Sequence, residues 1–299
     1  MHNSLWDSRP AAILLALFVV FLWATSWVLI KIGLEDIPPL TFAGLRYTLA
    51  TLVLLPFFLF KNGGLSLNGL TRRAAGKLMA LGLLLYGVTQ GAQFLALSYL
   101  PAVTVNLLWS FSPVWVALLG LRFLDERTTR FQWLGIFIAL AGAGIYFTPA
   151  AFPAGFGFGF TAAMIGILSN AIAAVIGREI NRARDRSPLQ VTVISMGTGS
   201  IVLLAVGIAV QGLPEIDLKG WAIISWLAVV NTAFAFTLWN FTLRSLTATE
   251  SSVINGMMLV FIPVLAVLFL DERIGAKELA GLIAAGLGTL LVQVRRKQQ

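Results

Sequence analysis

Polar and aromatic side chains occur at helical spacing inside the apolar stretches of this chain. Tyr86 and Gln90 fall at i and i+4, on one face of a helix. Asn106, Trp109 and Pro113 share a face in the next apolar stretch. Amide groups and aromatic rings hydrogen-bond and stack on a ligand, so the chemistry they suggest is binding rather than bond breaking.

Proline predicts where such a helix is interrupted. Pro113 has no N–H to donate to the carbonyl of residue 109, which leaves that carbonyl free beside the ring of Trp109. We therefore predict a helix kink at Pro113 and a second one at Pro263. The second proline lies one turn beyond Leu259, the repeat equivalent of Pro113, so we expect the second kink to be displaced.

Other polar or aromatic residues in the middle of apolar stretches are candidates for the same binding site. Asn255 is the equivalent of Trp109 in a repeat of the sequence described below. Interhelical hydrogen bonding is the alternative role for any of these residues, and the sequence leaves both open. The further substrate-binding candidates are Trp23, Asn170, Asn231 and Asn255.

Arg46 is the one deeply placed cation. A charged side chain inside a membrane is costly and usually has a partner. In one interpretation, Arg46 pairs structurally with a helix end or a carbonyl. In the other, it binds a substrate carboxylate.

Several classes of protein lack their required residues here. The chain has no cysteine and a single histidine, His2, in its tail. It offers no buried Ser/His pair, aspartate dyad or His/Cys ligand set, so we expect no enzyme, no metal site and no cofactor. The net charge of +8 is explained by basic membrane-flanking loops, so we expect no nucleic-acid partner.

The elements that would position these residues are membrane-spanning helices. The mean hydropathy is +0.88, and only 11% of the residues are charged. Ala11 to Ile30 carries no charge and has the length of about 20 residues that crosses a bilayer. The expected spans are 11–30, 40–60, 76–98, 101–122, 130–147, 160–179, 188–210, 219–243, 249–270 and 276–294.

The basic residues test this ladder of ten spans. With the N-terminus inside, most of the 21 Lys and Arg fall in inner segments, as the positive-inside rule requires. Both termini are then cytoplasmic, and we expect a multi-pass protein of the inner (cytoplasmic) membrane. The basic residues left on the outer side are Lys31, Lys219, Arg273 and Lys277.

The pentapeptide FLDER occurs at 123–127 and again at 269–273. A shift of 146 residues also aligns Gly135 with Gly281 and Gly142 with Gly288. We infer two five-helix repeats, residues 1–150 and 151–299. Because five is odd, the second repeat enters the membrane from the opposite side. The predicted fold is an all-α polytopic membrane protein of ten transmembrane helices in two inverted-topology repeats.

FLDER itself is predicted to be architectural. Catalytic carboxylates on opposite faces of a membrane could not serve the same reaction. Asp-Glu at a helix end can instead cap the first amides of the next helix. The paired glycines are predicted to be close-packing surfaces between helices.

The order of several loose motifs resembles the EamA-like branch of the drug/metabolite transporter superfamily over essentially the whole chain. The motifs are Leu22-Trp-Ala-Thr-Ser-Trp27, Lys31, Pro39 and Arg46, then Ser112-Pro113, Glu126 and Gly135, and in the second copy Glu272 and Gly281. The resemblance implies a ten-helix exporter of small metabolites, and the chain looks most like the aromatic amino acid exporters.

The expected function is therefore a secondary transporter that exports small neutral or zwitterionic metabolites by alternating access around a central cavity. Amino acids with aromatic or hydrophobic side chains suit a lining without mid-span Asp or Glu, and facilitated efflux is the preferred energetics. The alternatives are an exporter of drugs or other metabolites in the same superfamily, and a channel. The expected partners are a small-molecule substrate and the lipid bilayer, with a monomer as the working state.

Overall fold

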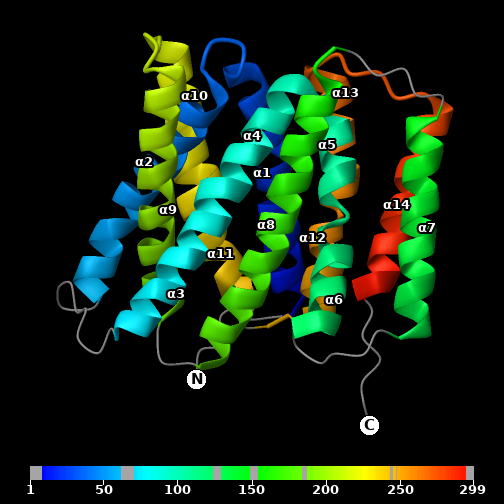
Figure 1. Ribbon diagram of the computed structural model, residues 1–299, viewed down its shortest axis with the longest axis horizontal. Coiled ribbons are helices and arrows are strands. Elements are labelled where there is room, and N and C mark those ends of the chain that lie inside the picture. The colour runs from blue at the N-terminus through cyan, green and yellow to red at the C-terminus, as the bar shows by residue number, and fades with distance from the viewer. Residues whose placement is uncertain are drawn as a thin grey trace. The chain divides into compact units, whose positions relative to one another are not determined.

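The computed structural model of the chain is helical wherever it has regular structure (Figure 1). The structure describes residues 9–61, 71–123, 129–148, 154–183, 187–242, 245–246 and 248–293. The first-copy helices are α1 (Arg9–Gly33), α2 (Pro39–Lys61), α3 (Arg72–Gly82), the π-helical segment η2 (Leu83–Thr89), α4 (Gln90–Tyr99), α5 (Ala102–Trp109), α6 (Ser112–Phe123) and α7 (Arg130–Phe147). The second-copy helices are α8 (Phe156–Ala183), α9 (Pro188–Gln211), α10 (Leu218–Ala228), the π-helical segment η3 (Val229–Phe234), α11 (Ala235–Thr242), α12 (Ala248–Gly256), α13 (Met258–Phe269) and α14 (Ala276–Gln293).

These helices confirm the predicted fold class. In the described part of the chain, nine helical stretches are long and apolar enough to cross a membrane. The remaining predicted span, 249–270, is found as a shorter apolar stretch, Val253–Phe269. Leucine, phenylalanine and valine side chains outside the core suit lipid, because hydrocarbon surrounds the spans as water surrounds a soluble protein.

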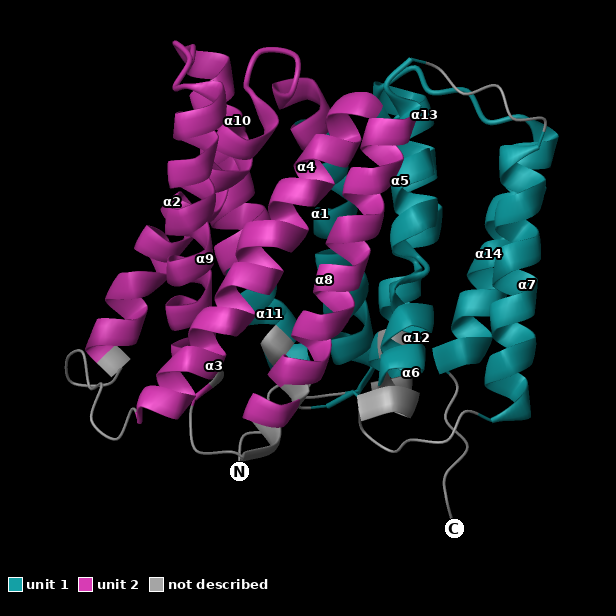
Figure 2. Ribbon diagram, in the orientation of Figure 1, with its two compact units in different colours: residues 1–29, 100–156, 234–299 teal, residues 30–99, 157–233 magenta. Residues whose placement is uncertain are grey.

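The chain forms two compact units (Figure 2). Unit 1 consists of residues 1–29, 100–156 and 234–299, and unit 2 of residues 30–99 and 157–233. Each unit takes helices from both sequence copies. The division near residue 150 stays a prediction about the repeat, since the compact units follow helix pairing rather than chain order.

In unit 1, α7 and α14 pack backbone against backbone. A Cβ added to Gly135 would lie 2.6 Å from the carbonyl oxygen of Gly288, and one added to Gly142 would lie 2.7 Å from that of Gly281. The order of these contacts makes the two helices antiparallel. They are repeat equivalents, so the antiparallel pair is what an inverted repeat requires. The predicted role of the glycine pairs in close packing is confirmed.

In unit 2, α2 and α9 form the corresponding pair. Both begin at a proline, Pro39 and Pro188, where a missing N–H does no harm in the first helical turn. A Cβ on Gly44 would lie 2.5 Å from the Cα of Leu204, and one on Gly207 would lie 2.6 Å from the amide nitrogen of Thr41. These helices also run antiparallel, and small residues again set how closely they approach.

Irregular backbone recurs at equivalent positions of the two copies. The π-helical segment Leu83–Thr89 falls on Val229–Phe234 after the shift of 146 residues. The interruption between α5 and α6, at Ser110 and Phe111, falls on Met257, which separates α12 from α13. Equal positions in both copies indicate that the duplication preserved the backbone irregularities.

The prolines relate differently to these interruptions. Pro113 lies in the first turn of α6, directly after the break, so it opens a helix. Pro263 lies inside α13, and the break at Met257 has no proline. The second interruption is therefore not displaced as the sequence predicts, because it does not depend on proline. A kink at Pro263 itself stays a prediction.

The FLDER carboxylate of the second copy caps a helix, but not the helix that follows it. Glu272 accepts hydrogen bonds from the backbone N–H groups of Ala102 and Val103, at 2.5 and 3.0 Å. These are the first amides of α5, whose own flanking residue, Pro101, offers no cap. After the first FLDER, α7 is instead capped by Thr129. Apart from Phe123, that first FLDER lies outside the described residues.

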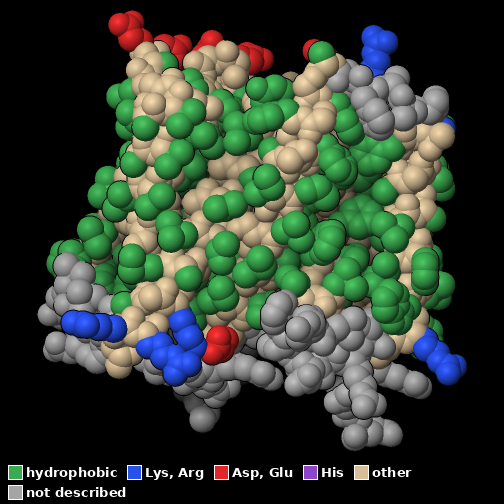
Figure 3. Space-filling model, in the orientation of Figure 1, with side chains coloured by type: hydrophobic (Ala, Val, Ile, Leu, Met, Phe, Trp, Pro, Cys, Tyr) green, Lys and Arg blue, Asp and Glu red, His purple; other side chains and the backbone are tan. Residues whose placement is uncertain are grey.

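The ends of the spans carry the charges. In the part of Figure 3 that corresponds to unit 2 of Figure 2, apolar side chains cover most of the face, with Asp and Glu at one end of the spans and Lys and Arg, beside one acid, at the other end. At the start of α3 in unit 2, Lys77 donates a 2.5 Å hydrogen bond to Glu179. This bond and the lysine charge lower the pKa of the Glu179 carboxyl, so the exposed pair is kept until the pH falls through that lowered pKa.

The α7–α14 contact predicts which glycines tolerate a methyl group. We expect Gly142→Ala to lower the free energy of unfolding by about 1–3 kcal/mol, because the new Cβ has no room against α14. Gly144, two residues away on the same helix, has nothing within 4 Å of its added Cβ. Gly144→Ala should leave stability unchanged or raise it by up to about 1 kcal/mol. Unfolding in detergent measures both, and equal stability of the two variants would contradict the packing.

The FLDER cap predicts a second stability effect. Glu272→Ala should lower the free energy of unfolding by about 1 kcal/mol, because two amides at the start of α5 lose their acceptor. Glu272→Gln should cost less, since the amide oxygen still accepts. The exposed Glu215 provides the control Glu215→Ala. Identical unfolding curves for Glu272→Ala and Glu215→Ala would refute the capping role.

Candidate functional site

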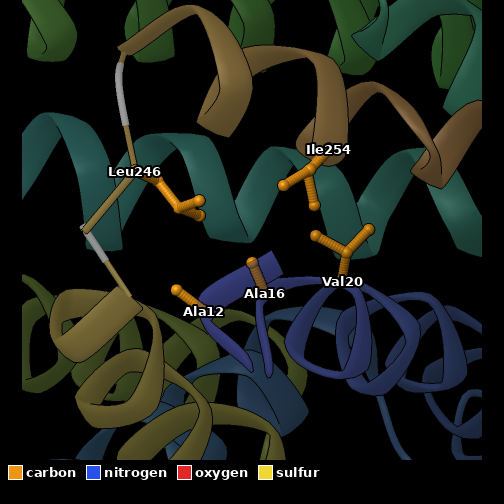
Figure 4. Packing of buried hydrophobic residues seen from close by; sticks show 5 residues of the cluster. All are labelled: Ala12, Ala16, Val20, Leu246 and Ile254. Carbon is orange, nitrogen blue, oxygen red and sulfur yellow. The ribbon is translucent and has the colours of Figure 1, made fainter. Parts of the chain in front are cut away.

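In unit 1, one face of α1 consists of small residues. Ala12, Ala16 and Val20 are spaced by four, and they pack against Leu246 and Ile254 (Figure 4). These side chains lie on one face of α1, and Ile254 belongs to α12. The next turns of α1 carry larger side chains, which meet α11.

Those next turns carry an aromatic cluster. The ring of Trp23 lies 5.3 Å from that of Phe236 and 5.2 Å from that of Trp239, both on α11. The Nε1 of Trp23 is buried and has no hydrogen-bond partner in the described part of the chain. A buried indole N–H normally finds a partner. The cluster thus holds a donor whose acceptor must come from elsewhere.

One turn further along α1, Trp27 contacts Trp109 edge to face at 6.3 Å between ring centroids. Trp109 is the last residue of α5, directly before the interruption. Asn106, one turn earlier, is buried and donates a 3.3 Å hydrogen bond from Nδ2 to the carbonyl oxygen of Met258. Asn106 thereby joins α5 to the first residue of α13, which is the interhelical role that the sequence left open.

Asn255 has no comparable environment. It is exposed on α12, two residues before the break at Met257. The two repeat-related positions Trp109 and Asn255 therefore have different surroundings: a half-buried ring in the first copy and an exposed amide in the second.

In unit 2, Tyr86 and Gln90 are joined through a third residue, Tyr47 on α2. The hydroxyl of Tyr47 donates a 2.6 Å hydrogen bond to Oε1 of Gln90. The Tyr47 ring lies 5.7 Å from the ring of Tyr86. The guanidinium of Arg46 lies 5.0 Å from the centre of the Tyr47 ring. Helices α2, η2 and α4 thus bring a cation, two phenols and an amide together.

The π-helical segment η3 completes this group. Thr232 is buried, and its hydroxyl donates to the carbonyl oxygen of Leu227, five residues back, at 2.8 Å. The same hydroxyl accepts from Arg46. The neighbouring Asn231 is fully buried, and Asn170 on α8 is half-buried. Both asparagines stay predictions as site residues.

Sequence reasoning missed Tyr47, Phe236 and Trp239. The last two had a signal, because the shift of 146 residues places them on Gln90 and Gln93. The polar face of the first copy thus corresponds to an aromatic face in the second. Tyr47 had none, since it follows Arg46 directly and belongs to no helical pattern of polar residues.

These groups are suited to binding. Among the described residues, no three His, Cys, Asp or Glu lie together as metal ligands would. Aromatic faces, amides, hydroxyls and one guanidinium recognise small organic molecules that carry both apolar and polar parts.

Three features define a class: the apolar spans, nine of them at full length in the described part of the chain, the antiparallel pairs of repeat-equivalent helices, and the helices interrupted at equivalent positions. Membrane transporters with inverted repeats are built in this way. The chain belongs to the EamA-like transporter family of the drug/metabolite transporter superfamily. The sequence profile of that family matches twice, at residues 10–148 and 157–294.

Relatives match along nearly the whole chain. An uncharacterized transporter of Archaeoglobus fulgidus is 26% identical over 291 residues, covering 95% of this chain and 98% of that protein. The uncharacterized inner membrane transporter YedA of Escherichia coli K12 is 28% identical over 300 residues, covering 93% and 88%. One solved crystal structure shares the fold at a TM-score of 0.67 and 18% identity, over 95% of this chain and 98% of that one.

Proposed function

We propose that this transporter exports amino acids with aromatic or hydrophobic side chains by alternating access, as facilitated efflux across the cytoplasmic membrane. The observation that carries the proposal is the aromatic cluster of Trp23, Phe236 and Trp239, which holds an indole N–H without an acceptor. Aromatic rings favour an apolar or aromatic side chain, and the free donor favours a polar atom on the same molecule.

The distribution of acids argues against cationic substrates. Every Asp and Glu among the described residues lies in a loop, in a first helical turn or near a helix end. A carrier of organic cations, or one driven through a membrane-embedded proton site, would be expected to hold an acid inside a span. Neutral and zwitterionic molecules avoid that requirement.

The orientation is part of the proposal: both termini face the cytoplasm. Contacts within each unit support an alternating ladder of spans. Arg9 at the start of α1 pairs with Glu250 at the start of α12, eight crossings later. Lys31 at the end of α1 donates to the carbonyl oxygen of Leu97, near the end of α4. With the basic ends inside, the positive-inside rule gives cytoplasmic termini.

The two FLDER turns test this orientation directly. The chain has no cysteine, so Arg127→Cys and Arg273→Cys each introduce a single label site at equivalent repeat positions. We expect a bulky, membrane-impermeant maleimide to label Arg273→Cys in intact cells, and Arg127→Cys only after permeabilisation. Labelling of both variants from the same side would exclude the inverted topology.

Transport itself tests the substrate. Purified protein in liposomes should move labelled tryptophan and phenylalanine with saturation and trans-stimulation, which a channel would not show. Trp23→Phe keeps the aromatic ring and removes the N–H. We expect it to reduce this flux about 2- to 10-fold, the scale of one hydrogen bond. Thermal stability should not fall, because a buried donor without a partner is unfavourable for folding.

Trp133, exposed near the start of α7, supplies the matched control. Trp133→Phe should leave the flux unchanged. Equal fluxes for Trp23→Phe and wild type would remove the cluster from the binding site. Transport of an organic cation in place of amino acids would favour the alternative, a drug exporter.

A further inference from the structure

Arg46 is the buried cation of unit 2. Its side chain, about two turns from the start of α2, is 5% exposed. Both Nε and Nη2 lie 3.3 Å from the hydroxyl oxygen of Thr232. The residue therefore meets η3 inside the unit, at a hydroxyl rather than at the helix end or carbonyl that the structural reading of the sequence named.

The guanidinium lacks an anionic partner. No carboxylate of the described residues lies within ion-pair distance of Arg46, since the ion pairs found there are Arg9–Glu250 and Lys77–Glu179. A guanidinium carries five N–H donors, whereas its acceptor in the described part of the chain is one hydroxyl. A charged side chain inside a membrane span is costly unless it pairs. If Arg46 had only a structural role, an apolar residue in its place or an acid beside it would be more stable.

The surrounding residues fix the position of the cation without neutralising it. The ring of Tyr47 lies 5.0 Å from Cζ of Arg46, and the Tyr47 hydroxyl is held by Gln90. Thr232 is oriented by its own bond to Leu227, so its lone pairs are directed to the guanidinium. Three neighbouring helices therefore hold the planar guanidinium by its Nε–Nη2 side, and the donors that Thr232 does not use lie on its Nη1–Nη2 side.

We propose that Arg46 binds the carboxylate of the transported molecule, with Tyr47, Gln90 and Thr232 as residues that position the guanidinium. This assignment deepens the proposed function, on which it rests, by fixing the substrate class as carboxylates, zwitterionic amino acids included. Arginine matches a carboxylate in bidentate geometry. Phosphorylated molecules are disfavoured, because Lys31, at the end of α1, is engaged with the carbonyl of Leu97.

Matched acid and amide pairs test the assignment. Proteoliposomes are loaded with phenylalanine or phenylalaninamide, with leucine or leucinamide, and with 3-phenylpropionate, which has a carboxylate and no amine. We expect the wild type to carry the acids and to discriminate against the amides. Arg46→Gln should lower the apparent affinity for the acids about 10- to 100-fold, the scale of losing hydrogen bonds to a charged group. The apparent affinity of Arg46→Lys for the acids should lie between that of the wild type and that of Arg46→Gln.

Lys77→Gln is the control, because it removes a positive charge at the surface of the same unit. It should leave the ratio of acid to amide transport unchanged. A second readout uses only the wild type: phenylglyoxal modification of Arg46, followed by mass spectrometry, should be slowed by phenylalanine and not by phenylalaninamide.

The outcomes separate the two proposals. Transport of carboxylates without aromatic or hydrophobic side chains would end the proposed function and leave the Arg46 assignment standing. Wild-type protein that carries amides as well as acids would overturn the assignment, as would Arg46→Gln lowering both equally. If no compound is transported, absence of carboxylate protection in the phenylglyoxal experiment overturns it as well.

Discussion

Close backbone contact between antiparallel, repeat-equivalent helices is the constraint on which the rest of this structure depends. Lipid is as apolar as leucine, so the hydrophobic effect does not drive helices together inside a membrane, and van der Waals packing must do so. Gly135 and Gly142 against Gly288 and Gly281 in unit 1, and Gly44 and Gly207 in unit 2, allow that packing. Each contact needs one helix from each copy. Because the equivalent helices face each other, the compact units draw on both copies, and neither copy forms a unit alone.

Backbone irregularity is tolerated within this frame because other groups satisfy the freed backbone. In η2 and η3, the hydroxyls of Thr89 and Thr232 donate to carbonyl oxygens five residues back, which are acceptors that a regular α-helix would have used differently. Met258 directly follows the interruption between α12 and α13, and its carbonyl oxygen accepts a hydrogen bond from Asn106 of α5. Such compensation is what membrane proteins require wherever a helix departs from regular geometry. π-Helical turns are rare in proteins as a whole, and those that occur are often found at functional sites. Here Thr232 of η3 contacts Arg46.

The sequence predicted those features that follow from composition and from the repeat. The spans, their order and the glycine contacts are periodic properties of the chain. In its described part, nine of the ten predicted spans are present at full length and the other as a shorter apolar stretch, and the glycine contacts are present too. The helix capped by Glu272 was not predictable, because Ala102 lies 170 residues away and only tertiary packing brings them together. The break at Met257 was missed because proline was the only breaker that the sequence displayed. Tyr47 was missed for the same reason as the helix capped by Glu272: its partner Gln90 belongs to a different helix.

The two copies share a backbone and differ in chemistry at the positions that matter for binding. Tyr86 corresponds to Thr232, and Gln90 to Phe236. Gln90 accepts a hydrogen bond in the polar group around Arg46, whereas Phe236 lies in the aromatic cluster with Trp23. Each unit therefore has its own chemistry: unit 2 holds a polar group around Arg46, and unit 1 holds an aromatic cluster around Trp23. Charged groups and aromatic rings require opposite environments. The same irregular backbone, repeated twice, therefore supports a polar environment in one unit and an aromatic environment in the other.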